Sequence, residues 1–321
     1  MRPVRRRLSG LAAALAILVA GCGGDGDEPA RRSVLALDFQ PNAAHAGVYT
    51  ALARGDDREQ GIHLMVRAPS ASTDSLKLLT SRRADLAILD IHDLGLARER
   101  GEDLVGVAAV VQQPLAAVIA REEVRRPRDL EGRRAGVTGL PSDDAVLRAV
   151  VEGDGGDFEG VERVTIGFSA VPSLIAGKVD GATAFWNAEG VALRERGART
   201  RDFRVADFGA PPYPELVLVV RRETLRRDRD LVERTVAALK AGTEAASSDP
   251  NLALDPIAKA GGGDRDLVRA QLAAIRPALS PALRLDRRAL DGWAAFDERF
   301  GILERKPDVG RAFSFDVVKQ D

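Results

Sequence analysis

From residue 33 to about residue 220, short apolar runs alternate with stretches whose apolar residues recur every three or four positions. Short continuous apolar runs are typical of strands buried on both faces, and the 3.6-residue period is typical of amphipathic helices. We predict strands at 34–37, 62–66, 84–89, 104–111, 115–120, 134–137, 161–166, 181–185 and 216–220. We predict helices between them at 43–53, 75–80, 143–151, 171–176 and 188–196. This alternation predicts an α/β fold with largely parallel sheets.

The pattern changes after a breaker-rich segment at residues 208–214 (FGAPPYP). Beyond the strand at 216–220, we predict mainly helices, at 230–246, 251–260, 266–275 and 287–300. A weak internal repeat relates residues 79–87 (LTSRRADLA) to residues 174–182 (LIAGKVDGA), because each ends a helix and places an aspartate at the entry to a strand. The repeat favours two similar lobes.

We therefore expect two α/β lobes joined by a hinge of two crossing strands. The first lobe is expected to comprise residues 33–118 and 213–321, and the second lobe residues 119–212. Because ligands of open α/β sheets bind at the carboxyl ends of the strands, we expect the ligand site in the cleft between the lobes.

Composition and charge narrow the class of protein. Hydrophobic residues make up 45% and charged residues 30% of the 321 positions, as in ordinary globular domains. Residues 1–21 hold four arginines and no acid, which leaves 43 basic and 48 acidic residues in the remainder, a net charge of −5. A mildly acidic body is a poor candidate for binding nucleic acid, which requires neutralising phosphates.

The N-terminus has the features of an export signal at residues 1–21. Three consecutive arginines (residues 5–7) precede ten apolar residues (11–20), too few to cross a hydrocarbon core about 30 Å thick. The segment VAGC at 19–22 resembles a bacterial lipobox, so we expect Cys22 to be lipidated; the alternative is an ordinary cleaved signal with an incidental cysteine. As the sole cysteine, Cys22 forms no internal disulfide. We expect residues 22–32 to form a flexible leash from an anchor on the extracytoplasmic face of the cell membrane.

Several motifs carry a resemblance to a known family. Residues 37–49 (LDFQPNAAHAGVY) resemble the opening signature of the NMT1/THI5-like family, and further likeness lies at 111–115 (VQQPL) and 208–213 (FGAPPY). The segment DLEGRRAGV at 129–137 is shared by many type II solute-binding proteins. The resemblance implies a type II periplasmic-binding-protein fold. It also implies a binding protein that captures a thiamine-precursor aminopyrimidine, of hydroxymethyl- or formylaminomethyl-pyrimidine type, for an ABC permease and its ATPase.

Four candidate ligand-binding residues lie in the predicted first lobe. Phe39 ends the first strand, where the family often carries a tryptophan, and is a candidate to stack on a pyrimidine, or is a core aromatic. Asn42 matches the edge of a pyrimidine in its donors and acceptors, or caps the helix that follows. His45 is placed to donate to a ligand carbonyl, and Asp90, just past a strand, to line the floor of the cleft.

The remaining candidates lie in the predicted second lobe and the return crossing. Trp186, Asn187 and Glu189 follow a strand directly; Glu189 is suited to pair with an aminopyrimidine, or is a favourable charge in a first helical turn. Ser142 begins a helix and either binds a polar ligand group or acts as an N-cap. Tyr213 is expected to close over the ligand. We expect the ligand to lie between the indole of Trp186 and the amide of Asn42.

We predict binding rather than catalysis. The synthase branch of the family requires a lysine near the third strand and a cysteine-rich run with iron, whereas residues 85–92 (DLAILDIH) hold no lysine and Cys22 is alone. With three histidines and no metal-ligand spacing, we expect no metal, and we expect no cofactor. We expect a monomer. The alternatives are a binding protein for another small solute (a sulfonate, nitrate or riboflavin-like compound) and a pyrimidine-synthesising enzyme.

Overall fold

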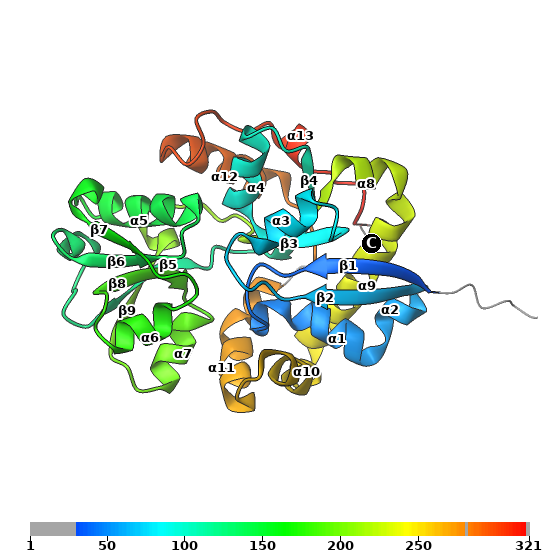
Figure 1. Cartoon of the computed structure of the whole chain (residues 1–321), viewed down its shortest axis with the longest axis horizontal. Helices are drawn as coiled ribbons and strands as arrows, with labels where there is room; N and C mark the ends of the chain where they lie inside the picture. Colours follow the sequence, from blue (N-terminus) through cyan, green and yellow to red (C-terminus); the bar gives the residue numbers. More distant parts are fainter. Residues whose placement is uncertain (1–29, 280–281, 319–321) are drawn as a thin grey trace, which may run out of the picture.

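Two five-stranded sheets, each the centre of an α/β lobe, organise the computed structural model, which describes residues 30–279 and 282–318 (Figure 1). The first sheet contains β1 (Arg31–Ala36), β2 (Ile62–Arg67), β3 (Leu86–Asp90), β4 (Leu104–Val111) and β10 (Leu216–Arg221). The second sheet contains β5 (Ala116–Arg121), β6 (Arg134–Val137), β7 (Glu162–Thr165), β8 (Gly181–Phe185) and β9 (Thr200–Arg204). The expected signal segment and Cys22 lie outside the described residues.

The two sheets have the same topology. Their strand orders are β2-β1-β3-β10-β4 and β7-β6-β8-β5-β9. In each sheet the first three strands are parallel, and the fourth, β10 or β5, is antiparallel to both of its neighbours. The chain enters each lobe from the other lobe through this fourth strand. The largely parallel sheets that the sequence predicts are therefore present, each with one antiparallel strand supplied by a crossing.

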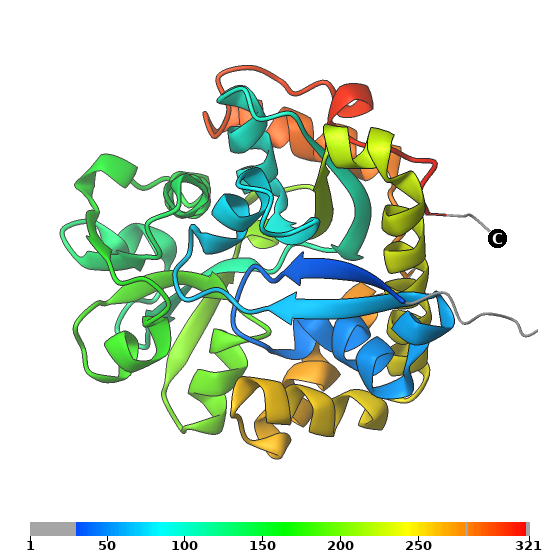
Figure 2. The same cartoon turned by 45° about the vertical axis from the view of Figure 1, so that its right-hand side comes forward.

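Helices cover both faces of each sheet (Figures 1 and 2). In the first lobe, the elements before β4 are η1 (Ala43–His45), α1 (Ala46–Arg54), α2 (Asp56–Glu59), α3 (Asp74–Thr80) and α4 (Ile91–Glu99). The second lobe contains η2 (Pro127–Leu130), α5 (Pro141–Gly153), η3 (Phe158–Gly160), α6 (Ala170–Ile175), α7 (Glu189–Glu195) and η4 (Val205–Phe208). After β10 the first lobe adds α8 (Arg222–Arg227), α9 (Arg229–Ser248), α10 (Asn251–Gly261), α11 (Arg265–Ile275), η5 (Arg276–Leu279), α12 (Arg287–Arg299) and α13 (Val309–Ala312). None of these helices is long and apolar enough to cross a bilayer.

The elements that the sequence pattern missed are α4, β9, the short helices α2, α8 and α13, and the single-turn helices η2 to η5. α4 has no clear apolar stripe because it is buried on several sides, and its Gly95 sits under other side chains: a Cβ there would lie 2.9 Å from Leu303 Cδ1 and 3.1 Å from Trp293 Cζ2. β9 is an edge strand of mixed polarity (TRDFR) and lacks the apolar run that marks the interior strands.

Two short segments connect the lobes, residues 112–115 and 209–215. Ala116 already pairs with Phe185 in the second sheet, so the first crossing ends before residue 118, where the sequence pattern put the end of the first lobe. Buried aliphatic residues continue through both sheets, and the strands next to the crossings, β5 and β10, are buried over almost their whole length.

Candidate functional site

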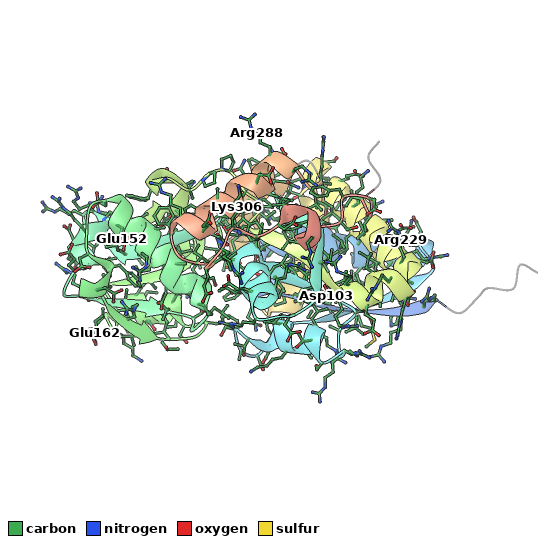
Figure 3. The ribbon with its side chains drawn as sticks, turned by 90° about the horizontal axis from the view of Figure 1, so that it is seen from above. Asp103, Glu152, Glu162, Arg229, Arg288 and Lys306 are labelled. Atoms are coloured by element: carbon green, nitrogen blue, oxygen red, sulfur yellow. The ribbon has the colours of Figure 1, made fainter. Side chains whose placement is uncertain are left out.

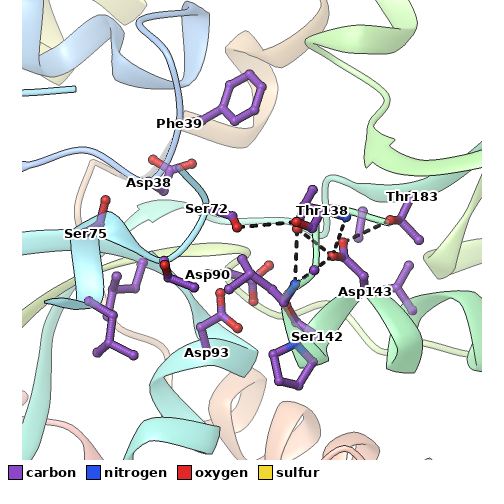
Figure 4. Close-up of a pocket in the computed structure, with 18 of the residues that line it drawn as sticks. Asp38, Phe39, Ser72, Ser75, Asp90, Asp93, Thr138, Ser142, Asp143 and Thr183 are labelled. Carbon is purple, nitrogen blue, oxygen red and sulfur yellow. Dashed lines mark hydrogen bonds between the residues drawn. The ribbon is translucent and has the colours of Figure 1, made fainter. Parts of the chain in front are cut away.

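A cavity of about 330 Å³ lies between the two lobes (Figure 4). Its walls come from the segments that follow β1 and β3 in the first lobe and β6, β7 and β8 in the second lobe, which are the carboxyl ends of these strands. The helices α4 and α5 begin at this cavity, one from each lobe. This is the place where a two-lobed α/β protein is expected to bind a small molecule.

Two aromatic rings from opposite lobes meet at the cavity. Phe39 follows β1, Phe168 follows β7, and their ring centroids lie 4.5 Å apart in an edge-to-face arrangement. Both side chains are half-buried. A planar ligand is well matched to such rings, because aromatic contacts add about 0.5–1.5 kcal/mol beyond the area that they bury.

The polar lining of the cavity is dominated by carboxyl groups. Five acidic side chains line it, and the one cationic side chain is that of the exposed Arg100 at the far end of α4; the acids are Asp38, Asp90, Asp93, Asp143 and Glu189. Such a lining favours a ligand that carries N–H donors or a basic nitrogen, and disfavours an anion.

Several of these acids are held by local hydrogen bonds. Asp143 Oδ2 accepts from the backbone and hydroxyl of Thr138, at 2.8 and 2.5 Å, and its Oδ1 accepts from Thr183 Oγ1 at 2.9 Å. Ser142, a predicted site residue, is buried at the start of α5 and lines the cavity together with Asp93 of α4 from the other lobe. Burial raises the pKa of Asp93 well above its usual range and also raises that of Asp143.

Glu189 has the side chain most suited to a change of charge at neutral pH. Its Oε2 accepts from the backbone N–H of Phe185 at 3.2 Å, at the point where β8 ends. Burial, with the nearby carboxyl groups of Asp38 and Asp143, raises the pKa of Glu189 to about 7. The carboxyl is therefore able to serve as a donor or as an acceptor within the ordinary pH range.

Asn42 and His45 do not line the cavity, but they hold a residue that does. Asn42 Oδ1 accepts from Ala44 N at 2.8 Å, and its backbone N–H donates to His45 Nδ1 at 3.2 Å, which forms a capping box at the start of η1. The proton of His45 is then on Nε2, which donates to Asp38 Oδ1 at 2.8 Å. The two side chains therefore orient Asp38 at the cavity wall.

Trp186, Asn187 and Tyr213 also lie away from the cavity. Trp186 is buried, with its Nε1–H donating to Pro114 O at 3.1 Å in the first crossing and its ring under the guanidinium of Arg204. Asn187 is fully buried, and its amide has no hydrogen-bond partner within the described residues. Tyr213 is fully buried against His92. The indole and amide that the sequence suggested as the grip on the ligand thus do not face one shared cavity.

Asp90, which lines the cavity floor, belongs to a buried polar cluster at the hinge. Oxygen and nitrogen atoms of Asp90, His92 and Glu215 come within 4.8 Å of one another, a spacing that is compatible with a metal ion. Both nitrogens of His92 are already engaged, however: Nδ1 lies 2.6 Å from Asp297 Oδ1 and Nε2 lies 3.0 Å from Tyr213 Oη. The cluster is thus a hydrogen-bonded network.

A second hollow, of about 880 Å³, lies on the outer face of the first lobe beside α3. Its lining is mainly basic and includes Arg32, Arg67 and Lys77. It involves a single lobe and has no aromatic lining, so it lacks the features that mark the cavity between the lobes.

Of the nine ligand-binding residues predicted from sequence, Phe39, Asp90, Ser142 and Glu189 line the cavity. The cavity residues that sequence reasoning missed include Asp38, Ser72, Asp93, Thr138, Asp143 and Phe168. Phe168 had a detectable signal, because it follows a strand directly after Gly167, as Phe39 follows β1. Asp93 lies in α4, a helix that the sequence pattern did not show.

Comparison with known proteins identifies the family to which this chain is similar. The family model described as NMT1/THI5 like matches residues 42–253. A formylaminopyrimidine-binding protein of Halalkalibacterium halodurans is 31% identical over 232 residues, which cover 71% of this chain and 70% of that protein. The 4-amino-5-hydroxymethyl-2-methylpyrimidine phosphate synthase THI12 of Saccharomyces cerevisiae is 23% identical over 67% of this chain and 66% of its own length.

Solved structures share the fold at lower identity. The ligand-binding component of an ABC-type import system from Staphylococcus aureus has a TM-score of 0.73 at 14% identity, with 89% of this chain and 97% of that chain covered. The alkanesulfonate-binding protein SsuA from Xanthomonas axonopodis pv. citri has a TM-score of 0.72 at 18% identity, with 89% and 99% covered. The two lobes therefore have the type II periplasmic-binding-protein fold. Since the family model spans well over half of its residues, the chain belongs to the NMT1/THI5-like family.

Proposed function

We propose that this protein is the extracytoplasmic substrate-binding lipoprotein of an ABC importer, and that it captures a thiamine-precursor aminopyrimidine when its two lobes close. The observation that carries the proposal is the acidic cavity between the lobes, with one phenyl ring from each lobe at its edge. A flat, nitrogen-rich ring with an exocyclic amine presents the N–H donors and the aromatic face that this lining complements.

Particular cavity residues take particular roles in this proposal. Phe39 and Phe168, whose rings contact each other, together cover one side of the pyrimidine ring. Glu189 pairs with a ring nitrogen and the exocyclic amine, and Asp38 and Asp90 accept further N–H or O–H groups of the ligand. These contacts come from both lobes, so they are complete only when the lobes are closed, and ligand binding shifts the population toward the closed state.

The anchor and the transport partners are also part of the proposal. The signal at residues 1–21 and the lipobox around Cys22 support export and lipidation, which would hold the protein, as a monomer, near a permease and its ATPase. The similarity to a formylaminopyrimidine-binding protein supports a pyrimidine of formylaminomethyl or hydroxymethyl type as the ligand.

The synthase relatives suggest a second function, which the residues of this chain do not favour. The strand β3 and its surroundings (DLAILDIH, 85–92) contain no lysine, and Cys22 is the only cysteine. A sulfonate or nitrate as ligand is disfavoured because the cavity lining offers no cationic side chain other than the exposed Arg100 at the far end of α4.

Calorimetric titration of the purified mature protein tests the proposal. We expect saturable one-to-one binding of hydroxymethyl- or formylaminomethyl-aminopyrimidine, and no binding of taurine or nitrate. Phe39→Ala should weaken pyrimidine binding about tenfold, since it removes an aromatic contact and its buried area. Phe315→Ala is a matched control, because this half-buried ring packs against Arg287 and does not line the cavity.

The outcomes separate the alternatives. Binding of an anion with no response to pyrimidines would overturn the ligand and leave a transport role. A pyridoxal-phosphate absorbance band in the purified protein would instead support the synthase function.

A further inference from the structure

Glu215 connects the ligand cavity to both segments that join the lobes. It ends the second crossing, and its Oε2 accepts from the backbone N–H groups of Leu115 and Ala116, at 2.5 and 3.0 Å, where the first crossing enters β5. Its own backbone carbonyl accepts from Ile91 N at 3.0 Å, at the start of α4. The side chain is fully buried. A single carboxyl group thus fastens the two crossings together.

The same carboxyl group contacts the cavity through Asp90. Side-chain oxygens of Asp90 and Glu215 lie within 4.8 Å of each other, and Glu215 Oε1 has no N–H or hydroxyl partner within the described residues. Asp90 Oδ1 accepts from His92 N at 2.7 Å, and the side chain of Asp90 lines the cavity floor. Two carboxyl groups this close in a buried site favour a state with one proton between them, because two adjacent negative charges are strongly unfavourable there.

The surroundings decide which of the two groups carries the proton. Glu215 receives two backbone N–H donors, which stabilise its ionised form, whereas Asp90 receives one. Burial opposes a positive charge on the imidazole of His92, but the carboxyl groups of Asp297, Asp90 and Glu215 raise its pKa to about 10. The positive charge of His92 then balances the negative charge of Asp297. Burial and then Glu215 raise the pKa of Asp90 well above its usual range, against the attraction of His92. The other titratable groups near this pair are Asp93 on α4 and the fully buried Tyr213, and Asp143 on α5 acts in turn on Asp93.

We propose that Glu215 is a positioning residue that keeps Asp90 protonated and oriented, so that the cavity floor presents a neutral carboxylic acid to the ligand. The inference rests on the proposed function only for the identity of the ligand. Glu215 does not line the cavity itself. Through Asp90, it determines whether the cavity accepts the neutral or the protonated form of an amine-bearing ligand. With Asp90 neutral, the cavity accepts the uncharged ligand without a compensating proton.

The variant Glu215→Gln removes the ionisable group at this position and keeps the shape of the side chain. A glutamine oxygen accepts the N–H groups of Leu115 and Ala116, and its amide donates to Asp90, so that both hydrogen bonds persist without the shared proton. Asp90 then becomes an ionised carboxylate at the cavity floor. Asp90→Asn is the complementary change, because its amide donates to Glu215 with no proton required. Glu162→Gln, an exposed residue at the outer edge of the second lobe (Figure 3), is the control.

Infrared spectroscopy of the ligand-free protein at pH 8 tests the charge state directly when the aspartate side-chain carboxyl groups carry 13C, because the isotope shift separates aspartate bands from glutamate bands. The difference between the wild type and Asp90→Asn is expected to show the carbonyl stretch of one protonated carboxyl group. Glu215→Gln should lose the same band and gain the isotope-shifted bands of an aspartate carboxylate, and Glu162→Gln should retain the protonated-carboxyl band. If Glu215→Gln does not fold, the comparison of the wild type with Asp90→Asn still shows whether Asp90 is protonated. An ionised Asp90 in the wild type, with or without a bound cation, would overturn the proposal.

Calorimetry in two buffers with different heats of ionisation then tests the effect on binding. We expect pyrimidine binding to Glu215→Gln to take up about one proton per ligand more than binding to the wild type at pH 7, since the ligand must be protonated to pair with an ionised Asp90, whereas the contribution of Glu189 is common to both proteins. Equal proton uptake by the two proteins would overturn the role in specificity. If no pyrimidine binds either protein, the proposed ligand fails, whereas the infrared result on Asp90 stands independently.

Discussion

The carboxyl of Glu189 shows how a single residue ties ligand binding to stability. It lies among other acids at the end of β8, and its pKa of about 7 is well above that of a glutamate in an unfolded chain. Between pH 4.5 and 7 the folded protein therefore binds a proton at this site that the unfolded chain does not. Linkage requires the free energy of unfolding to fall as the pH rises through this range.

Glu189→Gln should remove this part of the pH dependence. A shift of this size corresponds to about 3 kcal/mol, so we expect the variant to match the wild type near pH 4 and to be more stable by up to that amount at pH 8. Urea unfolding across this pH range measures the effect. Glu195→Gln, an exposed change on the same helix, should keep the slope of the wild type. A wild-type slope in Glu189→Gln would contradict the assigned pKa.

At this scale the sequence predicts residue types at the site better than their roles. Glu189, Phe39 and Asp90 line the cavity because residues that follow parallel strands face the cleft, which is a property of the chain order. Asn42 and Trp186 follow strands too, yet the capping box turns Asn42 back onto its own helix and Pro114 takes the indole N–H of Trp186. Such contacts depend on tertiary neighbours that the sequence pattern does not contain.

The internal repeat has a structural meaning at the scale of elements. Asp85 and Asp180 each precede the third strand in the order of their sheet, and each bonds through both its backbone and its side chain to the second strand in that order, β1 or β6. Asp85 N donates to Val34 O and Asp85 Oδ2 accepts from Val34 N, both at 2.9 Å. Asp180 forms the same two bonds with Arg134, at 2.8 and 3.1 Å. The repeat thus marks the same strand junction in two lobes of equal topology.

The helices α1 and α9 of the first lobe pack closely against each other. The helices approach through glycines: a Cβ on Gly242 would lie 2.2 Å from Gly47 O and 2.6 Å from Ala51 N. These atoms belong to the backbone of α1 and cannot move aside as a flexible side chain would. Gly242 is therefore needed for the close approach of the two helices and not for a turn.

Gly242→Ala is expected to destabilise the protein by about 1–3 kcal/mol, as overpacking does, although alanine is the better helix former. Gly292→Ala is the matched control, because it also lies in a helix and its Cβ would meet only Pro211 at 3.4 Å; we expect it to be neutral or to stabilise by up to about 1 kcal/mol. Urea unfolding gives both values. Equal effects of the two substitutions would show that α1 and α9 are not in such close contact.

The two lobes are in contact at the scale of the whole molecule, on both sides of the cavity. Phe39 meets Phe168, and Ser72 Oγ donates to Thr138 O at 3.4 Å. On the far side, α11 of the first lobe contacts α7, where Gln271 Nε2 donates to Ala188 O at 3.2 Å. The two lobes are therefore closed on each other in this structure. The two short segments that connect the lobes allow them to separate.

Closure should depend on the ligand, because contacts among a few side chains are weak without a molecule that bridges the lobes. Small-angle X-ray scattering of the ligand-free protein is expected to give a radius of gyration larger than that calculated from the closed structure, and a saturating pyrimidine should reduce it to the calculated value. Phe168→Ala should need more ligand to reach the same value, because it removes an interlobe contact and a ligand contact together. A radius of gyration that is the same with and without bound ligand would mean that the lobes do not open, and that the ligand enters a preformed cavity.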